Sequence, residues 1–177
     1  MLDTLITSKT RIKLLLKFFL NSNTQGYLRN LESEFGESTN AIRLELNKFE
    51  KANMLESQMD GNKKVFRANT KHPLFPEIQT IVRKYIGIDR IVDHIVSKVG
   101  DLQCACLIGE YARGKDTGIM EVLLVGSDLN QLYLQNLGRK VEEMINRKVC
   151  FSTVDINDYE KKSYSELDCI ILWEKES

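Results

Sequence analysis

The chain has 177 residues, of which 42% are hydrophobic and 28% charged, and its 25 basic and 25 acidic side chains give a formal net charge of zero. This composition excludes collagen-like, low-complexity and fully disordered chains, because it supplies enough apolar side chain to bury a core. No apolar run approaches the roughly 20 residues that a membrane-spanning helix needs, and the N-terminus has no signal-peptide pattern. We therefore expect a cytoplasmic protein with no membrane partner.

The charges are distributed unevenly along the chain. Residues 1–72 carry a net charge of +4, and residues 73–177 carry a net charge of −4. This asymmetry predicts two parts with different partners, of which the first is better suited to a polyanion.

Three short helices are predicted in the first part. One begins near Thr7 or Ser8, a second follows Gly26 and ends at Gly36, and a third begins after Ser38, which is a favourable N-cap residue. Their predicted inward positions are Ile12, Leu15, Leu16 and Phe19; Leu28, Leu31 and Phe35; and Ile42, Leu46 and Phe49.

A β-hairpin is predicted after the third helix. Two strand-like runs, 54–59 and 63–68, flank the turn Asp60-Gly61-Asn62, and Asp-Gly in this setting favours a tight hairpin turn. Three short helices followed by a hairpin with a basic tip is the order of a winged helix-turn-helix. We therefore predict such a domain over residues 1–72.

Polar side chains on the outer face of the third helix are candidates for DNA recognition. Arginine suits guanine, asparagine suits adenine, and serine or threonine can bind phosphate. The alternative is an ordinary solvated helix face. The candidate DNA-binding residues are Ser38, Thr39, Asn40, Arg43 and Asn47 on the helix and Lys63 and Lys64 at the hairpin tip, with Lys9, Arg11 and Lys13 as further phosphate contacts.

Residues 73–100 are predicted to form a helical linker, which begins at Pro73 and contains two broad apolar stripes. The stripes indicate either packing onto a neighbouring domain or a dimer interface. The first stripe is Ile78, Ile81, Val82 and Tyr85, and the second is Ile88, Ile91, Val92, Ile95, Val96 and Val99.

From residue 101 to residue 177 the pattern predicts a small mixed-sheet domain, which makes the whole chain α+β. Strands are expected at 102–108, 119–125, 149–154 and 169–173, with a loop over 109–118, a helix over 130–146 and a short capped helix after Asp155. The cysteines Cys104, Cys106, Cys150 and Cys169 lack the spacing of a zinc site, so we expect buried reduced thiols, no metal site and no cofactor.

Two segments resemble known families. YLRNLESEFGESTNAIRLELNKFEKANML resembles the helix-turn-helix of ArsR-type winged-helix transcriptional regulators. LIGEYARGKDTGIMEVLLVG, residues 107–126, resembles a minimal nucleotidyltransferase fold, whose signature is a strand ending in Gly-Ser, a loop, and a strand bearing Asp-x-Asp. The resemblance implies a DNA-binding regulator fused to a nucleotidyltransferase-like domain.

The second segment departs from that signature. Ile119 occupies the first Asp position, Glu121 occupies the second, and Glu110 replaces the Ser after Gly109. One carboxylate does not hold a pair of Mg²⁺ ions, so the expectation is a catalytically inactive domain with no catalytic residues, in a protein that is not an enzyme. Gly109, Arg113, Gly114 and Lys115 are candidate contacts for a nucleotide or other small-molecule effector, against the alternative of a plain turn.

The leading functional hypothesis is a sequence-specific regulator of transcription that binds double-stranded DNA as a homodimer. The alternatives are a Mg²⁺-dependent nucleotidyltransferase acting on a protein or small molecule, and a protein–protein assembly module. A metal sensor of the ArsR type is excluded by the sequence, because no cysteine occurs before Cys104.

Overall fold

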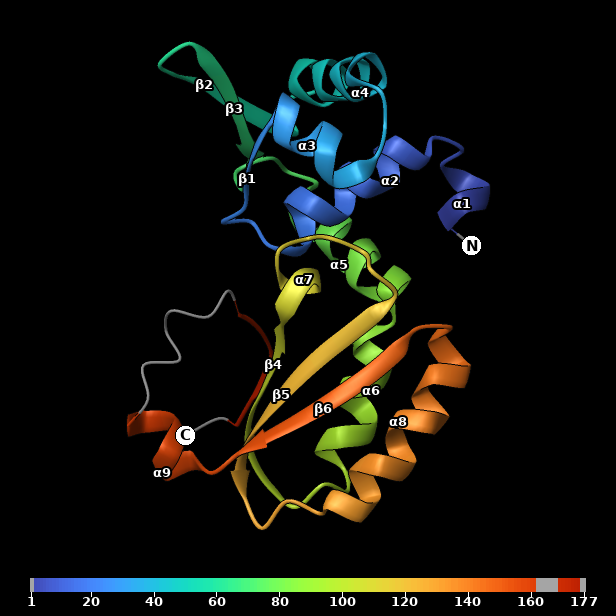
Figure 1. The fold of residues 1–177 in the computed structure, drawn as a ribbon, viewed down its shortest axis with the longest axis vertical. Coiled ribbons are helices and arrows are strands. Elements are labelled where there is room, and N and C mark those ends of the chain that lie inside the picture. The colour runs from blue at the N-terminus through green and yellow to red at the C-terminus, as the bar shows by residue number, and fades with distance from the viewer. Residues whose placement is uncertain (1, 162–168, 176–177) are drawn as a thin grey trace. The chain divides into compact units, whose positions relative to one another are not determined.

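The computed structural model describes residues 2–161 and 169–175 (Figure 1). The chain divides into two compact units between Tyr85 and Ile86. This division lies inside segment 73–100, which the sequence predicts as a linker. Helix α5 (Phe75–Ile86) belongs almost entirely to the first unit, whereas α6 (Ile88–Val96) belongs to the second.

The first unit contains the three predicted helices and the predicted hairpin. Its sheet also has a short strand that the sequence analysis did not predict, in the order β1-β3-β2. The elements before α5 are α1 (Leu2–Leu5), α2 (Lys9–Leu15) with its π-helical continuation η1 (Leu16–Leu20), β1 (Gln25–Tyr27), α3 (Leu28–Phe35), α4 (Thr39–Lys51), β2 (Leu55–Asp60) and β3 (Lys63–Ala68).

Local capping explains where these helices begin and end. The Ser8 hydroxyl accepts a hydrogen bond from the backbone N–H of Arg11 and so caps α2. Helix α3 ends at Gly36, whose φ of 62° lies in the left-handed region that favours glycine. The predicted helix boundaries are therefore confirmed because they depend on neighbouring residues.

The core of the first unit is formed by the predicted apolar faces. Leu31, Ile42 and Leu46 are at most 1% exposed. The ring of Phe19 packs against those of Phe49 and Phe75, with centroids 6.4 and 5.6 Å away. The contact with Phe75 anchors α5 to this unit.

The hairpin forms in the predicted register, with Asp60 paired to Lys63 across the turn. Gly61 in the turn has a φ of 58°. Strand β1 adds to the other edge of β3, with Gly26 opposite Phe66. A Cβ atom at Gly26 would lie 2.9 Å from the ring of Phe18, so packing requires glycine there.

The second unit is a four-stranded mixed sheet with helices on both sides (Figure 1). The strand order is β6-β5-β4-β7; β5 and β6 are parallel and the other pairs antiparallel. After α6, the elements are β4 (Asp101–Ile108), α7 (Gly109–Ala112), β5 (Ile119–Ser127), α8 (Gln131–Ile145), β6 (Lys148–Val154), α9 (Ile156–Lys161) and β7 (Ile170–Glu174). The α+β class with a small mixed sheet is confirmed.

Helix α8 connects the parallel strands β5 and β6, as parallel pairing requires. Its N-cap is Asn130, whose side chain accepts a hydrogen bond from the backbone N–H of Tyr133. The Tyr133 hydroxyl donates to the His94 carbonyl at 2.8 Å and so ties α8 to α6. In Figure 1 these two helices lie on one side of the sheet, and α9 lies on the other.

Two predictions for this unit are corrected by the structure. Segment 109–118, expected to be a loop throughout, begins with the helical turn α7. The expectation of buried cysteines holds for Cys104 and Cys106 but is wrong for Cys150, which is exposed on β6, and Cys169 is only half-buried. Over the described ranges, none of the helices combines the length and apolar character needed to cross a bilayer.

Candidate nucleic-acid interface

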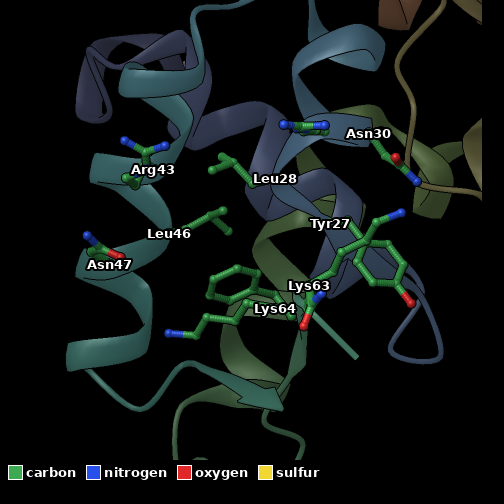
Figure 2. Close-up of a pocket in the computed structure, with 11 residues that line it drawn as sticks. Tyr27, Leu28, Asn30, Arg43, Leu46, Asn47, Lys63 and Lys64 are labelled. Atoms are coloured by element: carbon green, nitrogen blue, oxygen red, sulfur yellow. The ribbon is translucent and has the colours of Figure 1, made fainter. Parts of the chain in front are cut away.

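A groove with a volume of about 580 Å³ opens in the first unit between α3, α4 and the hairpin (Figure 2). Helix α4 forms one wall, and residues at the tip and along the second strand of the hairpin form the other. The lining residues are Tyr27, Leu28, Arg29, Asn30, Arg43, Leu46, Asn47, Asn62, Lys63, Lys64 and Phe66.

The amphipathic pattern of α4 determines which side chains face this groove. Ile42 and Leu46 point into the core, whereas Arg43 and Asn47 are exposed and lie one helical turn apart. Figure 2 shows both of these polar side chains along the helix wall. Asn40 is exposed one turn earlier on α4 but does not line the groove.

Three cations on the groove have no acidic partner among the residues described by the structure. Arg29, Arg43 and Lys63 make no ion pair with any of the residues that the structure describes. Because no carboxylate neutralises them, these side chains give the groove a positive potential and remain free to bind an anion.

Lys64, unlike the three cations above, is engaged in an ion pair within the protein. Its ammonium group donates to the Glu50 carboxylate at 2.7 Å and lies 5.1 Å from the centre of the Phe66 ring. Hydrogen bonds from Lys64 and Ser57 lower the pKa of Glu50. The predicted contact at Lys64 therefore competes with an intramolecular pair, whereas that at Lys63 does not.

The structure gives Ser38 a local role. Its hydroxyl accepts a hydrogen bond from the backbone N–H of Ala41 at 3.2 Å and so caps α4. Thr39, the first residue of the helix, is half-buried. Neither residue lines the groove, so these two predicted DNA contacts lie at its margin.

We expect Ser38→Ala to lower the free energy of unfolding by about 1 kcal/mol, because the first turn of α4 loses its capping acceptor. Urea denaturation followed by circular dichroism measures this change. Ser38→Asp is the matched control, since a carboxylate oxygen also accepts the Ala41 N–H, and it should retain wild-type stability. Equal stability of the alanine variant and the wild type would contradict the cap.

Two of the further phosphate contacts are occupied within the protein. The Arg11 guanidinium bonds the Glu45 carboxylate with its Nε at 2.8 Å. The Lys13 ammonium bonds the carboxylate of Glu37 at 2.8 Å and the Phe35 carbonyl at 2.7 Å. These pairs join α2 to α4 and to the residues after α3, so their evident role is to hold the helices together.

Arg29 and Tyr27 were not among the predicted site residues. Arg29 is exposed on the first turn of α3, between the half-buried Leu28, which lines the groove, and the buried Leu31. That position was a usable signal, because a cation there points away from the core. The Tyr27 hydroxyl donates to Asp60 at 2.6 Å, a contact across the sheet that no local pattern indicates.

The second candidate site, in segment 109–118, is largely neutralised by its own residues. The Glu110 carboxylate pairs with Lys115 at 3.0 Å and with Arg113 at 3.3 Å. Hydrogen bonding from Lys115 lowers the pKa of Glu110. The two cations predicted to bind a phosphorylated effector are thus already paired, and the geometry favours the plain-turn alternative.

Gly109 and Glu121, which occupy two positions of the nucleotidyltransferase signature, lie next to each other in the structure. Glu121 lies in the strand pair opposite Ile108, and its carboxylate packs against Gly109, leaving no room for a side chain there. Gly109 and Gly114 both have positive φ, of 71° and 77°. Within the described ranges, no group of three or more His, Cys, Asp or Glu side chains is arranged to hold a metal ion.

Hydrogen bonds among Tyr111, Asp116 and Arg147 hold the end of segment 109–118 in place. Asp116 accepts hydrogen bonds from the Tyr111 hydroxyl, from Arg147 at 2.8 Å and from the backbone N–H of Gly118 at 3.1 Å. Arg147 also donates to the Tyr111 oxygen at 2.8 Å. Asp116 is therefore engaged in fixing the turn onto β6 and α8.

No protein-family model matches the chain, and no curated protein matches it. The crystal structure of AF1382 from Archaeoglobus fulgidus is similar, with a TM-score of 0.37, 22% identity, and coverage of 55% of this chain and 99% of that one. A mutant of the toxin–antitoxin pair MntA–HpeT is also similar, with a TM-score of 0.40, 18% identity, and coverage of 51% of this chain and 75% of that one. Likenesses at this level concern the fold alone.

These matches, with TM-scores of 0.37 and 0.40, assign neither a superfamily nor a role to the chain. They contradict the expectation that the chain is not an enzyme, which depended on the missing aspartate at position 119. The missing aspartate is therefore no ground for excluding catalysis, and the exclusion was wrong. The ArsR-type resemblance is untouched by the matches and stays a prediction.

Proposed function

We propose that the first unit binds double-stranded DNA with sequence specificity, and that the protein is a transcriptional regulator. The observation that carries this proposal is a set of cations, Arg29, Arg43 and Lys63, that make no ion pair within residues 2–161 and 169–175 and surround a groove beside the exposed face of α4. Unpaired cations at an open groove attract a polyanion, and a helix with an exposed polar face fits the major groove.

The side chains divide into base-reading and phosphate-binding groups. Arg43 suits the two acceptors of guanine, and Asn47, one turn later on the same face, suits adenine. Lys63 at the hairpin tip and Arg29 on α3 flank this face and would contact phosphates, which orient the protein without reading sequence. This division agrees with the winged-helix order of the elements, and a homodimer would place two such helices on a palindromic site.

The proposal is tested by selecting bound duplexes from a random DNA pool with the full-length protein. The selected DNA should share a motif with two related half-sites. Affinity for it should fall steeply as salt rises, with a slope of log K against log salt of about −0.9 for each phosphate contacted. No enrichment, or an affinity independent of salt, would overturn the proposal.

A further inference from the structure

Three thiols gather on one face of the sheet in the second unit. Cys104 and Cys106 are two residues apart on β4, so their side chains point the same way, and their sulfur atoms lie 3.3 Å apart. Cys169, just before the neighbouring strand β7, packs against the same cluster, and its thiol hydrogen-bonds that of Cys106. The three sulfurs thus form a chain with Cys106 in the middle.

The surroundings of this cluster are apolar and open at one end. Cys104 is 9% exposed and Cys106 is fully buried, whereas Cys169 is half-buried. The side chains packed around the sulfurs are those of Leu123, Val125, Val154, Ile156 and Tyr159. Glu174, which pairs with Cys104 across β4 and β7, is a carboxylate close to these thiols. The hydrogen bond with Cys106 lowers the pKa of Cys104, and the charge of Glu174 opposes that shift.

The hydrogen bond between the thiols favours the ionised form of Cys169. The Cys106 S–H donates to the Cys169 sulfur, which lowers the pKa of Cys169 to about 7 even though partial burial opposes the shift. The hydrogen bond with Cys104, and after it the one with Cys169, raise the pKa of Cys106, so Cys106 keeps its proton. At neutral pH a large fraction of Cys169 is therefore thiolate, the reactive form of cysteine.

We propose that Cys169 is an oxidation site for hydrogen peroxide and small hydroperoxides, with Cys106 as the residue that positions and stabilises its thiolate. The Cys169 sulfur attacks one peroxide oxygen, a sulfur–oxygen bond forms, and the oxygen–oxygen bond breaks. For hydrogen peroxide the leaving group is hydroxide, which takes up a proton to become water. The sulfur is oxidised by two electrons to a sulfenic acid, and the peroxide is reduced by two.

The Cys106 thiol also offers the sulfenic acid a second step. Its sulfur can attack that of Cys169, forming a disulfide between β4 and the residue before β7, with loss of water. The sulfenic acid and this disulfide are both products of oxidation at Cys169. A serine at position 106 leaves the hydrogen-bond donor but removes the second step.

The exposed Cys150 supplies an internal comparison for the experiment. Its side chain is more accessible than that of Cys169, and it makes no hydrogen bond to another thiol in the described part of the chain. Simple accessibility predicts that Cys150 is oxidised first, whereas the proposal predicts that Cys169 is.

In the experiment, reduced full-length protein is treated at pH 7 with hydrogen peroxide in the presence of dimedone, which traps sulfenic acids, and the cysteine peptides are quantified by mass spectrometry. We expect Cys169 to be oxidised at least tenfold faster than Cys150, as dimedone adduct or as disulfide with Cys106. Cys150→Ser should leave the rate at Cys169 unchanged. Faster oxidation of Cys150, or a Cys169 that stays reduced, would overturn the proposal.

A pair of variants tests the positioning role of Cys106. Cys106→Ala should slow oxidation of Cys169 at pH 7 and shift its pH profile upward, whereas Cys106→Ser should keep the wild-type profile and accumulate trapped sulfenic acid. Equal profiles for both variants would show that Cys106 does not act through its hydrogen bond. If the alanine variant fails to fold, the competition between Cys169 and Cys150 in the wild type still decides the proposal.

Discussion

Replacing Arg43 with alanine is expected to weaken binding of the selected DNA by about fivefold or more, since a bidentate arginine–guanine contact contributes about 1–3 kcal/mol. Arg43 is exposed and makes no ion pair within the described part of the chain, so its loss should leave the fold intact. Preference should relax at a single base position, because the lost donors read one base. Fluorescence anisotropy at fixed salt, with single-base variants of the site, measures both effects.

Two further variants separate base reading from charge. Lys63→Ala should weaken binding to all sequences alike and reduce the salt slope by about 1, as loss of a phosphate contact does. Lys84→Ala removes one exposed positive charge from α5, outside the groove, and should change affinity less than about twofold. If Arg43→Ala binds as the wild type does, α4 is not the reading helix.

Replacing Arg147 with alanine is expected to lower the free energy of unfolding by about 3 kcal/mol, the lower end of the range for breaking a buried pair. The guanidinium is 14% exposed and bonds both Asp116 and Tyr111, whose side chain is almost fully buried. In the variant, Asp116, which is 27% exposed, still accepts the hydrogen bond from the backbone N–H of Gly118. This remaining contact limits the loss of stability. Urea denaturation of the full-length protein measures the change.

The acid dependence of stability provides a second readout for this network. Burial by itself would raise the pKa of Asp116, but hydrogen bonds from Arg147 and Tyr111 outweigh it and lower the pKa. The resulting stabilisation is complete above the unfolded-state pKa of about 3.9 and is lost as pH falls through the lower folded-state pKa. Arg147→Ala should therefore lose less stability on acidification than the wild type.

Arg139→Ala is the matched control for Arg147→Ala. Arg139 is exposed on α8 and donates to the Asn136 side chain at 2.8 Å. Its removal should change the free energy of unfolding by less than about 0.5 kcal/mol. An Arg147→Ala variant as stable as Arg139→Ala would contradict the structural role assigned to the network.

Much of the fold could be predicted because its signals are local. The Ser38 cap, the end of α3 at Gly36 and the turn at Gly61 each depend on a few adjacent residues. Strand β1 was missed because it has only three residues and its Gly26 is required by contact with Phe18, a residue of the preceding helical turn.

The candidate interface was predicted in part. The exposed positions of Arg43 and Asn47 follow from helical periodicity, which the sequence displays. The ion pair between Arg11 and Glu45 could not be predicted from helical periodicity, because these two residues lie 34 positions apart in the sequence. The exposed position of Arg29 could have been recognised from the sequence, but its location in the same groove as Lys63 depends on how the hairpin packs beside α3.

The sequence alone predicts the helices of the first unit, their apolar faces and the hairpin. The strand pattern after residue 100 predicts the α+β class. These features depend on periodicity and turn chemistry, which act over a few residues. Only the tertiary structure decided which cations of the described residues remain unpaired, and that Cys169 meets Cys106 on the adjoining strand. Charges and thiols far apart in the chain acquire partners only when sheet order and helix packing bring them within about 4 Å of one another.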